Sequence, residues 1–337
     1  MKNALYLVPL VALALLPLWV TSPYALHIFI LLFVGVAMGE GWNVIGGYAG
    51  QYSIGHSAYS GTGAYCTLLL LQHFNVAPWY GIWAAMALAV VIALVIGSIT
   101  FRLRGPYFVL ASIAVAEIMR LSALNWKDVT NGAEGILVSD IPPFKVFGHV
   151  LTDWSGKVPY YYVGLGLAVI AVVVNLLVKR SKLGYYLQAI REDQDAANSL
   201  GIQLARYKLT GLVISAAVTG LAGSFVALYV GFIDPDGVLS LEVSVTAAFV
   251  AIIGGIGTVI GPLVGAAVLI PLAESLRANL VAHALFQMGV PEHSAVGSFL
   301  GENLSHAHVL VYGIIIIIVI LYMPDGIVGL RLKRARR

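Results

Sequence analysis

Hydrogen-bonding and ionisable side chains interrupt an otherwise apolar stretch over residues 40–63. Glu40 and Asn43 are three residues apart, so on a helix they would share one face. Six glycines lie among the polar residues over 46–63, and each weakens a helix by about 1 kcal/mol relative to alanine. The pattern favours a broken helix whose polar groups line a solute path, although close helix packing through small residues remains an alternative. The candidate path residues here are Glu40, Asn43, Gln51, Ser53, His56 and Ser57.

A second glycine-rich stretch, GGIGTVIGP, covers residues 254–262. Gly254, Gly255 and Gly257 are further candidates for the solute path. The simpler interpretation is a tight turn between two short helices, with Pro262 at the start of the second. The stretch lacks the Lys of a phosphate-binding G-x-x-x-x-G-K-[ST] loop. We therefore expect ATP to be hydrolysed elsewhere and not on this chain.

Catalytic and metal-binding motifs are missing from the sequence. There is no G-x-S-x-G nucleophile motif, and His306 and His308 lack the carboxylate of an H-E-x-x-H site. Glu117 and Arg120 have the i,i+3 spacing of a helical ion pair, which would be either structural or functional. We expect a protein that is not an enzyme and that carries no cofactor or metal of its own.

The composition identifies a membrane protein. Of the 337 residues, 60% are hydrophobic and 10% are charged, whereas soluble domains are about 45–50% apolar and about 25% charged. The apolar runs are continuous and do not alternate as barrel strands do, so they predict helices whose backbone groups are satisfied internally. The single cysteine, Cys66, excludes an intrachain disulfide. A chain this apolar has a lipid bilayer as its partner, and we expect no nucleic acid partner.

The expected fold is an all-α integral membrane domain over residues 1–337, with about ten transmembrane helices, some of them broken or short. A span needs about 20 apolar residues. The first segment is expected to be a retained helix, with a cleaved signal peptide as the alternative. The third, eighth and ninth segments are short. The ten segments are 4–21, 26–45, 58–72, 79–101, 106–122, 160–178, 209–231, 243–256, 258–273 and 308–323.

The basic residues predict the orientation. With ten crossings and a cytoplasmic N-terminus, 14 of the 19 Lys and Arg residues face the cytoplasm, as the positive-inside rule requires. Both termini are then cytoplasmic, and the protein is multi-pass. The eighth and ninth segments must form a hairpin around residues 254–261 or be shallow re-entrant pieces. Loops 123–159 and 274–307 face outward, and loop 179–208 faces the cytoplasm.

Two halves of the chain show a weak similarity. The glycine pairs at 46–47 and 254–255 each precede two crossings that end in a basic string, at 101–105 and 330–334. Both copies run in the same direction, which suggests a parallel internal repeat of the kind from which transporters are built.

The cytoplasmic loop 179–208 contains an amphipathic segment over residues 182–201. Its apolar residues form one helical stripe, and Gly201 is placed to end the helix. A helix lying on the membrane would carry Lys and Arg on its polar face, whereas this one is acidic over 192–195. We therefore expect it to dock in the groove of a partner protein, with a solvated connector as the alternative.

Five stretches of the sequence resemble the permease subunits of branched-chain amino acid ABC importers, and more closely the M-type member of the paralogous pair. They occur in the family's order, and the resemblance spans most of the chain, from about residue 40 to 330. The stretches are GYAGQYSIGHSAYSGTGAY (47–65), FRLRGPYFVLASIAVAEIMRL (101–121), NWKDVTNGAEGI (125–136), KLGYYLQAIREDQDAANSLGIQLARYKL (182–209) and GGIGTVIGPLVGA (254–266).

The resemblance implies a machine of five components. Besides this chain they are a paralogous second permease, two cytoplasmic ABC ATPases that bind ATP and Mg, and an extracytoplasmic solute-binding protein. The permease would lie in a bacterial inner membrane and would move branched-chain amino acids inward by alternating access. The loop would be the ATPase-coupling segment, with Ile190, Glu192, Asp193, Ala196, Ala197, Leu200 and Gly201 as its candidate residues.

Two alternative functions remain at the level of sequence. Importers of urea and short amides use similar permeases, so the solute is not fixed by the motifs. A self-sufficient secondary carrier or channel would instead need its own coupling-ion groups, for which Glu40, Asn43 and Glu117 are the candidates.

Overall fold

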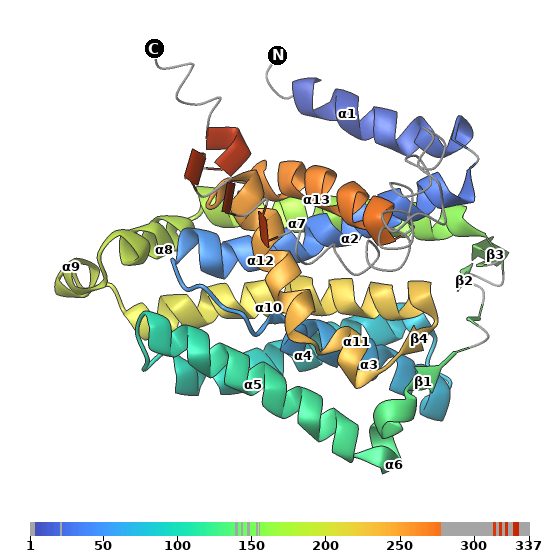
Figure 1. Ribbon diagram of the computed structural model, residues 1–337, viewed down its shortest axis with the longest axis horizontal. Helices are drawn as coiled ribbons and strands as arrows, with labels where there is room; N and C mark the ends of the chain where they lie inside the picture. The colour runs from blue at the N-terminus through green and yellow to red at the C-terminus, as the bar shows by residue number, and fades with distance from the viewer. Residues whose placement is uncertain are drawn as a thin grey trace, which may run out of the picture.

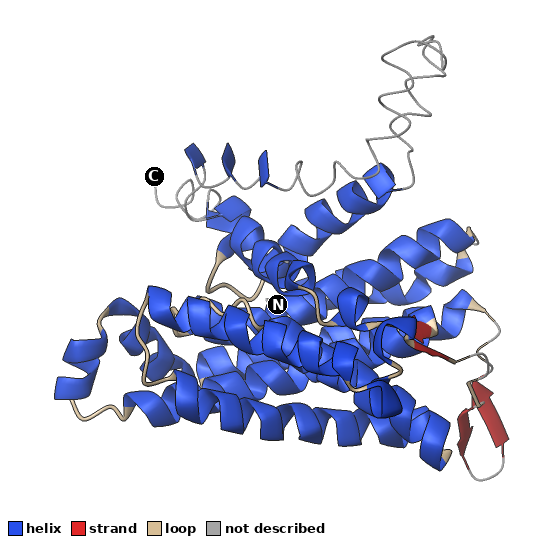
Figure 2. Cartoon of the chain, turned by 60° about the horizontal axis from the view of Figure 1, so that its bottom comes forward, coloured by secondary structure: helices blue, strands red, loops and turns tan. Residues whose placement is uncertain are grey.

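A computed structural model of the chain describes residues 4–20, 22–138, 141–142, 144–146, 149–152, 154 and 156–277, with the short stretches 313–314, 317–318, 321–322 and 326–329. The long helices lie roughly side by side (Figure 1). Helices α8 and α9 project at one end, and the four short strands are at the opposite end (Figures 1 and 2). We refer to these as the α8–α9 end and the β end.

Three helices form the buried centre of the bundle. In the most apolar 18 residues of α10, 78% are buried, compared with 22% in those of α4. Small residues allow this close packing: a Cβ at Gly223 would lie 1.9 Å from the carbonyl oxygen of Ser60, and one at Gly63 would lie 2.1 Å from that of Gly220. The central helices are α2 (Pro23–Trp42), continued by the π-helical turn η2 (Asn43–Tyr48), α3 (His56–Phe74) and α10 (Leu204–Val230).

The surrounding helices expose large apolar side chains. On α4, Val95 and Ile99 are 57% and 65% exposed, and on α5 Leu110 and Ile118 are both 62% exposed. Such surfaces suit lipid contact. The helices around the centre are α1 (Ala4–Leu15) with η1 (Leu16–Leu18), α4 (Pro78–Thr100), α5 (Pro106–Asn125), α7 (Lys157–Arg180), α12 (Leu241–Gly255) and α13 (Gly261–Arg277).

The β end consists of short elements. The two small sheets are antiparallel pairs, one between β1 and β4 and the other between β2 and β3. The elements are α6 (Lys127–Thr130), η3 (Gly132–Glu134), β1 (Ile136–Leu137), β2 (Phe144–Val146), β3 (His149–Thr152), β4 (Phe232–Ile233) and α11 (Pro235–Val238).

The predicted amphipathic segment forms two helices instead of one, α8 (Lys182–Glu192) and α9 (Gln194–Ser199). Asp193 causes the interruption. Its backbone is extended, and its carboxylate accepts hydrogen bonds from the amides of Asp195 and Ala196 at 2.9 and 3.0 Å. Such a side chain is a strong helix N-cap, so α9 starts in a new direction.

Eight of the ten expected segments coincide with long helices of the described chain. The turn expected at 254–261 is present, because α12 and α13 are consecutive helices joined by five residues. Whether this pair spans the membrane or is re-entrant stays a prediction. The third segment is longer than expected, since α3 has 19 residues. The first segment is a short apolar helix that Tyr161 ties to α7 by donating a 2.7 Å hydrogen bond to the carbonyl of Leu13.

Six helices of the described chain are long and apolar enough to cross a membrane, and two shorter apolar helices accompany them. The all-α membrane fold is therefore confirmed. Most of the tenth segment, most of loop 274–307 and the basic C-terminal string lie outside the described residues. The parallel repeat stays a prediction.

We predict that Gly223→Ala destabilises the fold by about 1–3 kcal/mol, the usual effect of overpacking, because the new methyl group would overlap the Ser60 carbonyl. Gly166→Ala is the matched control, since a Cβ there meets nothing within 4 Å. Thermal unfolding of the two purified variants in detergent measures the difference. Equal midpoints would show that α3 and α10 do not need this close approach.

Candidate functional site

The two glycine-rich stretches of the sequence meet in space. Asn43, the first residue of η2, binds the α12–α13 turn through both atoms of its side-chain amide. Its Oδ1 accepts from the amide of Gly257 at 2.8 Å, and its Nδ2 donates to the carbonyl of Thr258 at 2.9 Å. Asn43 is fully buried. It therefore links the end of α2 to the α12–α13 turn.

Glycine is required where the two stretches touch. A Cβ at Gly47 would lie 2.8 Å from the amide nitrogen of Gly257. Gly257 has a φ of +73°, a left-handed conformation that favours glycine. Gly254 packs equally closely within the hairpin, since its Cβ would lie 1.7 Å from the carbonyl oxygen of Gly261. The tight-turn interpretation of residues 254–262 is thus correct, and the turn also contacts η2.

Arg191 of α8 reaches the place where the two stretches meet. Its Nη1 donates a hydrogen bond of 2.9 Å to the carbonyl of Gly47. A Cβ at Gly257 would lie 2.7 Å from the same nitrogen. We call the set of Arg191, Asn43, Gly47, Gly257 and Thr258 the Arg191 junction. It joins α8, η2 and the α12–α13 turn, three segments far apart in the sequence.

Sequence reasoning did not select Arg191, because it lies off the apolar stripe of the loop. The available signal was a cationic side chain directly before the acidic residues of 192–195. The guanidinium donates through several N–H groups in a fixed planar arrangement, so it can hold a backbone carbonyl while the rest of the side chain packs. A Cβ at Gly50 would lie 3.0 Å from the Cγ of Arg191.

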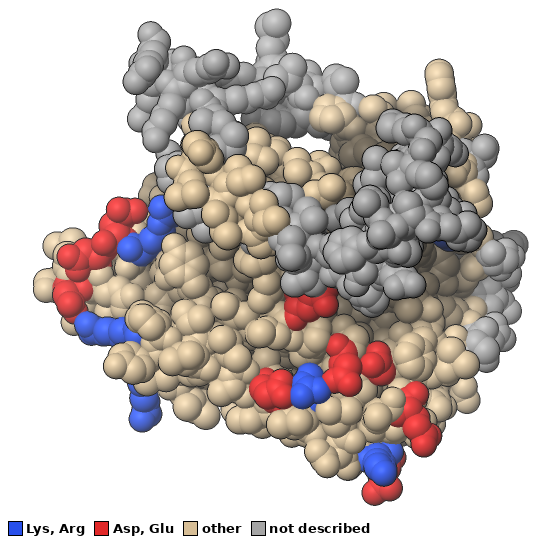
Figure 3. All heavy atoms as spheres, viewed as in Figure 1, with Lys and Arg blue, Asp and Glu red and all other residues tan. Residues whose placement is uncertain are grey.

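The candidate coupling residues divide into two groups. Ile190 and Ala197 are 0% and 3% exposed and pack inside this chain, so the apolar stripe is not a partner surface. Leu200 is 82% exposed and ends α9. The others on the exposed surface of α8, α9 and the turn after them are Glu192, Asp193, Ala196 and Gly201. The α8–α9 end also carries much of the charge visible in Figure 3.

Glu40 forms a separate buried site. Its side chain accepts a hydrogen bond from the Nδ2 of Asn175 on α7, and the hydroxyl of Tyr48 donates to the Oδ1 of Asn175. The Oε1 of Glu40 has no partner among the described residues. Glu40 thus contacts α7 whereas Asn43 contacts the α12–α13 turn, and the two residues do not act on the same neighbour.

The polar residues between α2 and α3 are packed inside the bundle. The Nε2 of His56 lies 2.8 Å from the hydroxyl of Ser215, and the amide of Ser57 donates to the hydroxyl of Ser244 at 2.7 Å. The carbonyl of Ser53 accepts from the indole of Trp42 at 2.7 Å. These bonds hold α3 against α10 and α12.

Gln51 is also buried, and its Nε2 donates to the carbonyl of Ala49 at 3.3 Å. Gly255 lies at the end of α12 and accepts a 2.8 Å hydrogen bond from the hydroxyl of Thr258. The break between η2 and α3 that the sequence predicts is therefore present, and it is closely packed as well.

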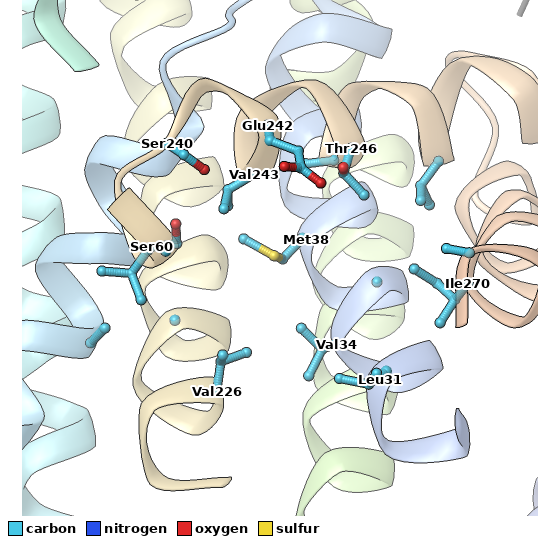
Figure 4. A pocket seen from close by; sticks show the side chains of 18 of the residues that line it. Leu31, Val34, Met38, Ser60, Val226, Ser240, Glu242, Val243, Thr246 and Ile270 are labelled. Atoms are coloured by element: carbon cyan, nitrogen blue, oxygen red, sulfur yellow. The ribbon is translucent and has the colours of Figure 1, made fainter. Parts of the chain in front are cut away.

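A cavity of about 450 Å³ lies elsewhere, between α2, α10, α12 and α13. Figure 4 shows Val34 and Met38 of α2 on one side, Glu242 and Thr246 of α12 on another, and Ile270 of α13 across from Val226 of α10. None of the nine predicted path residues lines it. Glu242, a charged residue in the otherwise uncharged sequence of α12, was the signal that sequence reasoning missed.

The predicted Glu117–Arg120 ion pair is present. The Nη2 of Arg120 lies 2.6 Å from the Oε1 of Glu117, and its Nη1 binds Asp236 of α11. The three side chains are partly exposed toward the β end. This arrangement fixes α5 against α11 and agrees with a structural role. Among the residues that the structure describes, no group of three His, Cys, Asp or Glu side chains could hold a metal ion.

We predict that Asn43→Ala lowers the free energy of unfolding by about 1–3 kcal/mol, because it leaves the buried amide of Gly257 and the carbonyl of Thr258 without their partner. Asn198→Ala, at an exposed position of α9, is the control. Denaturation of both variants in detergent gives the comparison. A loss no greater than that of the control would mean that the turn is held by other contacts.

Comparison with known proteins identifies the family. Residues 24–320 match the family model described as branched-chain amino acid transport system / permease component. The chain is 30% identical over 296 residues to the permease LivM of Escherichia coli, which covers 82% of this chain and 69% of that protein. No solved structure matches.

The paralogous permeases are more distant. The chain is 25% identical to the probable permease LivH of Methanocaldococcus jannaschii, over 83% of this chain and 84% of the relative. It is 24% identical to LivH of Escherichia coli, over 88% of this chain and 94% of that protein. The higher identity to LivM agrees with the M-type resemblance. The chain is a multi-pass transport subunit, and it belongs to the family of permease components of branched-chain amino acid ABC transporters.

Proposed function

We propose that this chain is the M-type permease of an ABC importer that moves branched-chain amino acids inward by alternating access. ATP hydrolysis on two separate cytoplasmic ATPases drives the cycle, and ATP and Mg bind there. A paralogous LivH-like permease completes the membrane part, and an extracytoplasmic protein delivers the solute. This chain contributes the solute path and the segment that receives the movement of an ATPase.

The charge distribution supports a cytoplasmic α8–α9 end and cytoplasmic termini. Short cytoplasmic loops are enriched in Lys and Arg. Arg104 forms a 2.8 Å ion pair with Asp195 of α9, so the turn after α4 lies at this end as well. The basic residues that helices α4, α7, α8 and α10 place here are Arg102, Arg104, Lys179, Arg180, Lys182, Arg206 and Lys208.

The observation that carries the proposal is the bond from Arg191 to Gly47. The apolar side of α8 is buried in the bundle through Leu187 and Ile190, so α8 is held firmly to the membrane part. A force applied to α9 reaches α8 directly, and Arg191 passes it to η2 and to the α12–α13 turn. Left-handed glycines lie at both places, Gly50 just after η2 and Gly257 in the α12–α13 turn, where the backbone can change direction.

The exposed surface of α9 suits an ATPase partner. Leu200 is an isolated, highly exposed apolar side chain, with Glu192, Asp193 and Asp195 close to it in the sequence. An apolar anchor surrounded by acidic groups fits a hydrophobic pocket with a basic rim. We assign this pocket to the ATPase.

The buried carboxyl of Glu40, whose Oε1 has no hydrogen-bond partner in the part of the chain that the structure describes, is the observation that favours a self-sufficient carrier. Such a carrier would bind a coupling ion or proton at Glu40. However, Glu40 does not line the large cavity and is enclosed by Asn175 and Tyr48. An importer of urea or short amides differs from the proposal only in the solute, which the assay below compares directly.

We predict that Arg191→Ala separates ATP hydrolysis from uptake in the complete importer reconstituted in vesicles. Leucine uptake should fall by about tenfold or more, as expected for a lost charge-assisted hydrogen bond, while hydrolysis falls much less. Arg206→Ala is the control, because Arg206 is a basic residue that is exposed on α10 and lies outside the Arg191 junction.

Three results would contradict the proposal. Uptake and hydrolysis that stay coupled in Arg191→Ala would remove the role of the junction. Leucine uptake by the chain without ATPases, driven by an ion gradient, would favour a carrier. ATP-driven uptake of urea or acetamide in place of leucine, with the companion binding protein, would change the solute.

We also predict that Leu200→Asp weakens ATPase docking. The substitution places a charge in an apolar pocket, so co-purification of the ATPases in mild detergent should fall about tenfold. Leu137→Asp is the matched control, because Leu137 is 72% exposed at the β end. If both variants retain the ATPases equally, the partner surface does not include the end of α9.

A further inference from the structure

The cavity between α2, α10, α12 and α13 has the size and lining of a small-molecule site. Its volume of about 450 Å³ falls within the range of about 300–1,000 Å³ that is usual for ligand pockets. Its apolar residues include Val34, Met38, Val226 and Ile270. Such a lining suits an aliphatic group of modest size.

The walls of the cavity are closely packed. A Cβ at Gly35 would lie 2.9 Å from Ile270, and one at Gly39 would lie 2.6 Å from Val250. The two glycines thus allow α2 to approach both α13 and α12 closely beside the cavity. The space is therefore preformed between tightly packed helices.

The charged residues that line the cavity are all acidic. Asp236, Glu242 and Glu274 contribute carboxylates, of which Asp236 is paired with Arg120, and no Lys or Arg is among the described residues that line the cavity. Such a lining attracts a cationic group and repels a phosphate. An ammonium group with an attached aliphatic chain fits this combination, whereas a phospholipid headgroup does not.

Hydroxyl groups supply the remaining polar contacts. Ser240 precedes the first turn of α12, and its side chain does not cap the helix. Figure 4 shows Ser240 and Thr246 on the same wall as Glu242. These hydroxyls can donate to the carboxylate of a bound solute while Glu242 accepts from its ammonium group.

The position of the cavity also suits a solute that arrives from outside. Glu242 lies in the first turn of α12, directly after α11 and β4, and therefore in the half of the bundle toward the β end. In the proposed orientation this half faces the binding protein. The solute would meet these carboxylates before it reaches the glycine-rich turns at the other end.

We propose that this cavity is a transit site for the amino acid, with its aliphatic side chain against Val34, Met38, Val226 and Ile270 and its ammonium group at Glu242. This inference rests on the proposed import function and adds to it the place where the permease itself selects the side chain. Selection by size then follows from Val226, whose side chain projects from α10 into the cavity (Figure 4).

The test measures the ratio of leucine to valine uptake by the complete importer in vesicles, with one binding protein and saturating ATP. Val226→Phe fills the cavity and should lower this ratio about tenfold, the scale of discrimination for one methylene group. Val226→Ala enlarges the cavity and should raise the ratio. The control Val230→Phe lies one turn later on α10, at a position that is 57% exposed.

The charge is tested in the same vesicles. Glu242→Gln should reduce uptake of both amino acids about tenfold through the loss of a hydrogen bond between charged groups. Glu134→Gln, an exposed carboxyl at the β end that does not line the cavity, should leave uptake unchanged.

Two results together would overturn the transit site and leave the import function intact. The ratio of leucine to valine uptake would stay at the wild-type value in both Val226 variants, and uptake by Glu242→Gln would equal uptake by Glu134→Gln. An unchanged uptake ratio together with loss of co-purified phospholipid in Val226→Phe would assign the cavity to a lipid tail, which also overturns the transit site. Absence of ATP-driven uptake by the wild-type importer would overturn both the transit site and the proposed function.

Discussion

The break in the chain between η2 and α3 imposes the constraint on which the other contacts depend. Residues 49–55 leave helical geometry inside a membrane domain, where lipid cannot satisfy free backbone groups. The protein satisfies them with its own side chains. Trp42 donates to the carbonyl of Ser53 at 2.7 Å, and the hydroxyl of Ser112 on α5 accepts from the amide of Ile54 at 2.9 Å. Each bond ties the break to a different helix, so the broken segment becomes the point at which the bundle is joined.

The same constraint explains why an element outside the bundle takes part. The carbonyl of Gly47, at the end of η2, receives its hydrogen bond from Arg191 of α8, and Asn43 occupies the amide of Gly257 and the carbonyl of Thr258. A polar contact that stabilises the break is thereby also a mechanical connection. Movement of α8 cannot occur without a response in η2 or the α12–α13 turn, unless this contact breaks. One set of hydrogen bonds thus both stabilises the helix break and connects it to the segment that faces the cytoplasmic partner.

The sequence predicted the fold well, because long apolar runs and glycine-rich turns are local signals. It located α4, α7 and the α12–α13 hairpin to within a few residues. It was less successful with α8 and α9, where the stripe of Leu187 and Ile190 was taken for a partner surface and is buried in the chain itself. The cavity could not be predicted, since Val34, Val226 and Ile270 are ordinary apolar residues that only packing brings together. Arg191 was missed for the same reason: its partner, Gly47, is 144 residues away.

The central claim is that α8 and the two glycine-rich turns move together during transport. A direct test is the structure of the complete importer in vesicles or nanodiscs, once without nucleotide and once with ATP bound to hydrolysis-deficient ATPases. The quantity to measure is the separation of the Arg191 Nη1 from the Gly47 carbonyl oxygen, 2.9 Å here. The account predicts that this bond persists in both states while η2 and the α12–α13 turn shift relative to α4 and α5. A bond that breaks in the ATP-bound state, with both turns unmoved, would contradict it.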